Sequence, residues 1–143
     1  SVGLIHTILP NARIIDARRH PLDACTGNLR QLYARGQTFS YDQTDIGEYY
    51  LQYQRMMDHW DEVLPGRVFH LGYEQLVADP QPTIASLLGY LGLDMEVACL
   101  HPERNAGAVT TFSRLQVRAG INASSVARWK PYERHLAPIL ESL

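Results

Sequence analysis

Cysteines are scarce in this sequence, and spacings typical of metal-binding motifs are missing. Its 143 residues contain two cysteines, Cys25 and Cys99, far apart and outside any Cys-x-x-Cys pair. The six histidines show no HxxxH or HExxH spacing. These absences argue against a disulfide framework and a structural zinc site, so we expect no bound metal and a reducing, cytoplasmic compartment.

An excess of charge and a long apolar run are also missing. Thirteen Lys and Arg face 15 Asp and Glu, for a net charge of -2, which removes the basic field that general nucleic-acid binding needs. No apolar run approaches the roughly 20 residues of a membrane span, and no secretory signal pattern opens the chain. We expect neither nucleic acid nor membrane as a partner. The start at Ser1, followed at once by an apolar segment, suggests processing or a missing upstream part.

The composition that remains is that of a folded globular chain. Hydrophobic residues make up 45% and charged residues 20%, and neither a repeat nor a linker divides the sequence. We therefore expect one domain over residues 1–143.

The periodicity predicts alternating helices and strands. Helical patterns cover residues 3–9, 21–33, 46–64, 80–91 and 132–140, and short β-branched strands cover 12–17 and 67–73. Asp79 is expected to cap its helix and Gly92 to end it. Helical sequence between the two strands implies a parallel pair, and thus an α/β fold with an irregular polar stretch at 105–125.

Aromatic residues recur at helical spacing within 46–64. We expect this stripe to pack into the core, and His59 to lie on a helix face; the stripe comprises Ile46, Tyr49, Tyr50, Tyr53, Met57, Trp60 and Leu64.

Two arginines follow the first strand directly. Ligands of open parallel sheets collect beyond the carboxyl ends of the strands, and Arg18 and Arg19 stand there beside a helix start at Pro21. An anion, most plausibly a phosphate, is the ligand this pattern favours. The alternative is that either arginine only pairs with Asp16, Asp23 or another acid. Asp23 itself is interpreted as a first-turn acid favoured by the helix dipole.

These segments together resemble the sulfotransferases that use 3'-phosphoadenosine-5'-phosphosulfate (PAPS), in particular the tyrosylprotein and bacterial tetratricopeptide-repeat-associated branch. The order and spacing of the pieces carry the resemblance, and it runs through nearly the whole chain. The pieces are residues 4–6, 10–15, 18–23 (Arg-Arg-His-Pro-Leu-Asp), 39–42, 57–60, 64–67, 73–80 (Tyr-Glu-Gln-Leu-Val-Ala-Asp-Pro), 116–118 and 124–129.

The resemblance implies cofactor-binding roles for individual residues. Arg19 matches the arginine that holds the 3'-phosphate of PAPS, and Gly27 stands where the family usually has a serine on that phosphate. Tyr73 matches a tyrosine that contacts the adenosine, although a tyrosine anchoring the strand end is an equal alternative. Further cofactor contacts fall in the family's late loop, with an ordinary polar surface loop as the alternative: Ser113, Gln116, Arg118, Asn122 and Arg128.

The family's loop for the 5'-phosphosulfate has no counterpart in these 143 residues. The resemblance therefore implies a partial P-loop-NTPase-like parallel sheet, and the C-terminal portion of a sulfotransferase domain. The family's general base also usually lies upstream, so no catalytic residue is assigned.

Three functional hypotheses remain. The first is a portion of a sulfotransferase that transfers the sulfuryl group of PAPS to an unidentified acceptor hydroxyl and yields adenosine 3',5'-bisphosphate. The second is an inactive nucleotide-binding or scaffold remnant of the same fold, and a remote third is a fragment of another P-loop-like nucleotide enzyme. An exposed sheet edge also predicts a homo-oligomer.

Overall fold

The computed structural model describes residues 2–31, 33, 37–104, 107 and 120–143. Contacts divide the chain into two compact units. The first unit comprises Ser1–Ile14, Arg19–Val68 and Ser125–Leu143, and the second comprises Ile15–Arg18 and Phe69–Ser124. The expected single domain over residues 1–143 stays a prediction.

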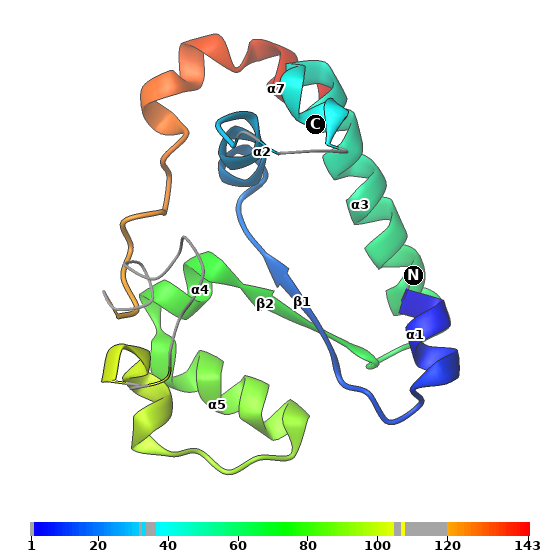
Figure 1. Ribbon diagram of the computed structural model, residues 1–143, viewed down its shortest axis with the longest axis vertical. Helices are drawn as coiled ribbons and strands as arrows, with labels where there is room; N and C mark the ends of the chain where they lie inside the picture. Colours follow the sequence, from blue (N-terminus) through cyan, green and yellow to red (C-terminus); the bar gives the residue numbers. More distant parts are fainter. Residues whose placement is uncertain (1, 32, 34–36, 105–106, 108–119) are drawn as a thin grey trace. The chain divides into compact units, whose positions relative to one another are not determined.

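The strands β1 (Ile14–Arg18) and β2 (Val68–Gly72) pair side by side in a parallel sheet, the one sheet among the described residues (Figure 1). Both strands are shorter than expected; β2 has the expected centre, whereas β1 begins two residues later and ends one residue later than expected. The α/β class is confirmed, and the P-loop-like nature of the sheet stays a prediction. Across the pair, the carboxylate of Asp16 on β1 contacts Nδ1 of His70 on β2 at 3.1 Å.

Helices α4 (Tyr73–Ala78) and α5 (Pro80–Leu91) follow β2 in the second unit. The sequence patterns did not predict α4. The expected end of α5 is confirmed, because Gly92 takes the left-handed conformation with φ 73°. The expected side-chain cap is wrong: Asp79 stands at the cap position but makes no capping hydrogen bond. The 3-10 turns η2 (Val97–Leu100) and η3 (Pro102–Arg104) come next.

The first unit is helical. Its elements are α1 (Val2–Ile8), α2 (Pro21–Leu29), η1 (Thr38–Tyr41), α3 (Gln43–Val63), η4 (Lys130–His135) and α7 (Ala137–Ser142). Helix α3 begins where the Asp42 carboxylate accepts the N–H groups of Thr44 and Asp45 at 2.8 and 3.1 Å. Helix α2 ends before the expected residue 33, and the single helix expected at 132–140 is instead η4 followed by α7.

The core of the first unit lies where α2, α3 and α7 pack together (Figure 1). Its buried members are Leu22, Cys25, Ile46, Leu136 and Ile139. The expected aromatic stripe on α3 is only partly buried. Tyr49 is 52% exposed, and its ring stacks on Phe39 with the centroids 4.0 Å apart. A flat ring pair on the surface excludes water without entering the core, which is why helical spacing alone misplaced Tyr49.

Candidate functional site

The adjacent arginines after β1 have different surroundings. In the second unit, Nε of Arg18 donates to the Asp16 carboxylate, the same oxygen that His70 contacts. The alternative that one arginine pairs with Asp16 therefore holds for Arg18. In the first unit, Arg19 donates through Nη2 to the Ser125 carbonyl at 2.5 Å, and its own carbonyl accepts the Tyr50 hydroxyl at 3.3 Å.

A hollow of about 240 Å³ lies along one face of α2. It brings together three residues for which the resemblance implies a cofactor role, Arg19, Gly27 and Arg128. All the residues that line it are Arg19, Asp23, Thr26, Gly27, Arg30, Gln31 and Arg128. Three guanidinium groups against one carboxylate give this hollow a positive character, which suits an anion.

Arg30 and Gln31 were not singled out from the sequence. They follow Gly27 by three and four residues, and this helical spacing was the available signal, although α2 itself ends at Leu29. The Arg30 guanidinium also lies over the Tyr132 ring, 5.7 Å from its centroid, which holds this cation beside the hollow.

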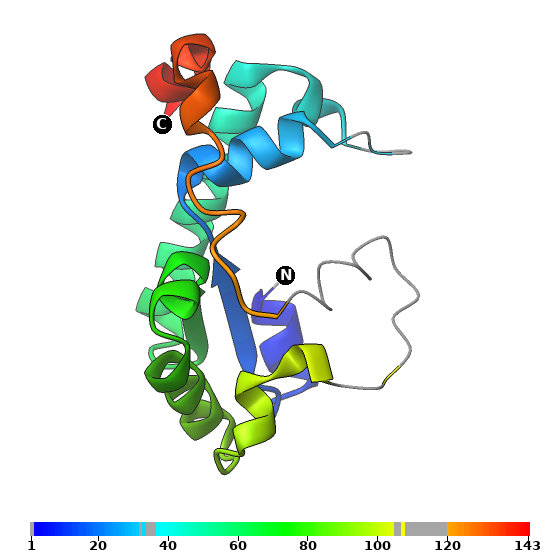
Figure 2. The same cartoon turned by 90° about the vertical axis from the view of Figure 1, so that its left-hand side faces the viewer.

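Residues 125–129 run along the start of α2 (Figure 2). The Asp23 carboxylate accepts the N–H of Ala127 at 2.7 Å and the N–H of Trp129 at 3.1 Å. The Trp129 ring stacks on His20, with centroids 5.5 Å apart and planes 12° from parallel. Asp23 is thus more than the first-turn acid predicted from the sequence, because it binds a segment about 100 residues away in the chain.

Two details of the hollow concern Gly27, which stands where the resemblance leads us to expect a serine. A Cβ at Gly27 would meet nothing within 4 Å, so this position has room for a serine side chain or for an incoming group. Next to it, the Thr26 side chain is 6% exposed. Its hydroxyl has no hydrogen-bond partner within the part of the chain that the structure describes. A buried hydroxyl without a partner is unfavourable unless a ligand or water completes it.

Tyr73 and Asn122, two further predicted contacts, lie together in the second unit. The Tyr73 hydroxyl donates to the Asn122 carbonyl at 3.1 Å, and the Asn122 side chain bridges the Gly120 carbonyl and the Ser124 N–H. Tyr73 is half-buried at the first position of α4, directly after β2 as predicted.

The other three predicted loop residues, Ser113, Gln116 and Arg118, lie outside the described residues.

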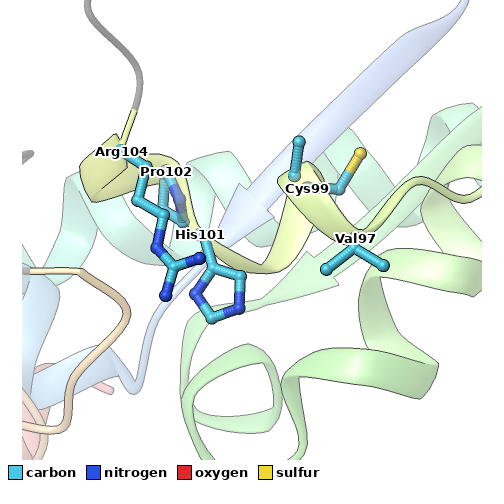
Figure 3. Close-up of a pocket in the computed structure, with 6 residues that line it drawn as sticks. Val97, Cys99, His101, Pro102 and Arg104 are labelled. Atoms are coloured by element: carbon cyan, nitrogen blue, oxygen red, sulfur yellow. The ribbon is translucent and has the colours of Figure 1, made fainter.

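A second hollow, of about 570 Å³, lies over η2 and η3 in the second unit (Figure 3). Its lining residues are Val97, Ala98, Cys99, His101, Pro102 and Arg104. Figure 3 shows the sulfur of Cys99 pointing away from the His101 ring. Nδ1 of His101 contacts Glu103 at 3.1 Å. The pKa of Glu103 is lowered, chiefly by a hydrogen bond with its own backbone and further by His101 and Arg104. No residue of this hollow was predicted to bind the cofactor.

The described ranges contain neither a cluster of metal-binding side chains nor a membrane-spanning helix. No group of three His, Cys, Asp or Glu side chains there is placed to hold a metal ion. No helix in those ranges has both the length and the apolar character needed to cross a membrane.

Comparison with known proteins identifies the family. A family model described as "Sulfotransferase family" matches residues 1–97. An uncharacterized protein of Aquifex aeolicus (strain VF5) is 35% identical over 145 residues, which cover 99% of this chain and 19% of that protein. The chain thus spans about a fifth of the length of this relative. On the family match, which includes β1, the two arginines and α2, the chain belongs to the sulfotransferase family.

Proposed function

We propose that this chain supplies the 3'-phosphate and adenosine side of a PAPS site in a sulfotransferase. The observation that carries the proposal is the hollow over α2, in which Arg19, Gly27 and Arg128 meet although Arg128 is distant in sequence. Two planar guanidinium groups offer paired donors to phosphate oxygens. In this proposal, Arg19 and Arg128 hold the 3'-phosphate.

The neutral donors of the hollow fit the same group. Thr26 supplies a buried hydroxyl without a partner among the described residues, and the missing side chain at Gly27 leaves open space beside it. A phosphate oxygen accepts from a hydroxyl as well as from guanidinium groups, so this set of groups suits a phosphate monoester better than an apolar ligand. On the resemblance alone, we also propose that the cofactor contacts Tyr73, Asn122, Ser113, Gln116 and Arg118.

When bound, PAPS supplies the activated sulfuryl group that is transferred to an acceptor hydroxyl. The residues assigned here hold the parts of the cofactor that do not react, and equal binding in ground and transition states does not lower the barrier. The 143 residues contain no glycine-rich loop with a basic residue to neutralise the phosphosulfate. We therefore propose that the chain acts with further sequence, and that by itself it binds the nucleotide without transferring the sulfuryl group. We also propose that the chain belongs to the tyrosylprotein and tetratricopeptide-repeat-associated branch of the family. We further propose that it associates with a second copy of itself through an exposed sheet edge.

Calorimetric titration with adenosine 3',5'-bisphosphate tests the phosphate role. Arg19→Ala removes a charge-assisted contact worth about 1.5 to 3 kcal/mol, so affinity should fall roughly tenfold or more. Arg55→Ala, on the exposed surface of α3 and outside the hollow, removes the same charge and should leave affinity nearly unchanged.

Two results would overturn the proposal. One is adenosine 5'-monophosphate binding as tightly as the bisphosphate, which would leave no 3'-phosphate contact. The other is equal affinity of the Arg19→Ala, Arg55→Ala and unmodified chains. Transfer from labelled PAPS to phenols, peptides or sugars by this chain alone would overturn the separate proposal that it needs further sequence.

A further inference from the structure

A carboxylate lines the same hollow as three arginines. Asp23 is 3% exposed and stands in the first turn of α2. A negative charge at this place opposes the binding of an anion by Coulomb repulsion. Its position therefore calls for a role that outweighs the repulsion.

The hydrogen bonds of Asp23 supply that role. One oxygen accepts the N–H of Ala127, and the other accepts the N–H of Trp129. These two residues flank Arg128, so a single buried carboxylate holds the backbone on both sides of this arginine. Both bonds are charge-assisted, which makes them stronger than ordinary backbone hydrogen bonds.

The backbone of Ala127 has an uncommon conformation, which agrees with a segment whose geometry is fixed by its contacts. Ala127 has φ 56°, the one positive φ at a residue other than glycine among the described residues. The left-handed conformation is unfavourable for an L-residue and persists where the surroundings determine it. Ala127 donates the shorter of the two bonds to Asp23, at 2.7 Å.

Further contacts from the start of α2 reach the same segment. Arg19 donates to the Ser125 carbonyl, and the His20 ring stacks on Trp129. Residues 125–129 are thus held at three points by residues 19–23. The Arg128 side chain itself is exposed at the edge of the hollow, so the fixed backbone is what limits where its guanidinium lies.

We propose that Asp23 is a positioning residue, which fixes the 127–129 backbone so that Arg128 reaches a phosphate bound over α2. This inference rests on the proposed function of the hollow. Ordering the Arg128 backbone before binding lowers the conformational entropy lost when the phosphate binds. The repulsion between Asp23 and the anion is the smaller effect.

Charge repulsion and backbone positioning by Asp23 predict opposite changes in nucleotide affinity for the substitution Asp23→Asn. Asp23→Asn makes the hollow more positive by one charge, so repulsion alone predicts tighter binding of adenosine 3',5'-bisphosphate. The variant also turns an acceptor oxygen into an NH₂ group facing a backbone N–H, which breaks one of the two bonds. Positioning therefore predicts affinity weaker by at least about fivefold. Asp58→Asn, the same change on the exposed surface of α3, is the matched control and should have little effect.

The test is a calorimetric double-mutant cycle of Asp23→Asn with Arg128→Ala, with circular dichroism to verify folding. If Asp23 acts through Arg128, its substitution should cost far less affinity when Arg128 is already alanine. Unchanged or tighter bisphosphate binding by Asp23→Asn, while Arg19→Ala and Arg128→Ala both weaken it, would overturn the positioning role and leave the proposed function intact. Unchanged binding by Arg19→Ala and Arg128→Ala would overturn the proposed function itself.

A measurement on the unmodified chain covers the case in which Asp23→Asn does not fold. If the Asp23 bonds favour phosphate binding, phosphate binding must favour those bonds to the same extent. Adenosine 3',5'-bisphosphate should then slow hydrogen exchange at the Ala127 and Trp129 amides more than adenosine 5'-monophosphate does, and Arg128→Ala should remove the difference. Equal slowing by the two nucleotides in the unmodified chain would overturn the positioning role.

Discussion

The two compact units of this chain differ in what they bury. Every fully buried apolar side chain among the described residues belongs to the first unit, where α2, α3 and α7 share a core. In the described part of the second unit the one buried residue is Thr83, which is 6% exposed and whose hydroxyl donates to the Asp79 carbonyl at 2.7 Å. The hollow over α2 is thus built on the better-packed unit, where a binding geometry is held more rigidly.

The units also use their carboxylates differently. Asp16 in the second unit contacts the side chains of Arg18 and His70. Asp23 in the first unit accepts two backbone N–H groups. An acid that pairs with a cation offsets its charge, whereas an acid that binds peptide N–H groups orders a segment of backbone. Arg18 and Arg19 have identical side chains and are neighbours in sequence, yet Arg18 pairs with an acid and Arg19 binds a backbone carbonyl.

Removing a core side chain should produce the largest effect. Ile139 is 0% exposed, and Ile139→Ala should cost about 2 to 5 kcal/mol of unfolding free energy through lost burial and a cavity. Leu88 on α5 is only half-buried, so Leu88→Ala should cost clearly less. Urea unfolding of both variants measures the difference. A Leu88→Ala loss as large as that of Ile139→Ala would break the contrast between the units.

Arg18→Ala should act on stability and leave nucleotide selectivity alone. The Arg18 and Asp16 side chains are 31% and 10% exposed, so losing this partly screened pair should cost about 1 kcal/mol in thermal unfolding. The ratio of bisphosphate to monophosphate affinity should stay as in the unmodified chain, in contrast to Arg19→Ala. A fall in that ratio would place Arg18 in the phosphate site.

Gly27→Ser should bring a modest gain. The new Cβ has open space, and the helix no longer carries a flexible glycine, whose cost is at most about 1 kcal/mol. If the hydroxyl reaches the phosphate, bisphosphate binding should tighten by a few-fold, while affinity for plain adenosine stays constant. Equal gains for both ligands would point to general rigidification of α2 instead.

The two cysteines give the smallest effect, a difference in reactivity. Burial raises the pKa of Cys25 from 9.0 to about 11, so this thiol stays neutral in the folded state. The contribution of the neutral Cys25 thiol to the free energy of unfolding is complete below pH 9.0. It should decline as the pH rises toward about 11, because the unfolded chain then gains from ionising this thiol. At pH near 8.5, iodoacetamide should modify the half-buried Cys99 before Cys25, as peptide mapping would show. Equal rates would contradict the tight packing of Cys25.

Local patterns in the sequence predicted much of the fold. The helical repeat from Pro21, the β-branched run around Ile14 and the glycine at position 92 each depend on nearest neighbours, and each prediction was confirmed in type. The ends were less accurate, since α2 stops at Leu29 and α3 begins at Gln43. The Asp42 cap fixes the latter start and was missed because capping depends on one side-chain rotamer.

The sequence by itself determined the parallel α/β pair, the absence of a cysteine framework, and the resemblance on which the family prediction was based. Periodicity and composition are local or additive properties, so they can be read without coordinates. Only the tertiary structure decided that Arg18 pairs with Asp16, that Tyr49 stays exposed, and that Asp23 holds the backbone around Arg128. These outcomes join residues up to 106 positions apart. No local pattern encodes the contacts of Asp23, because they depend on where the packing of α2, α3 and α7 places the chain.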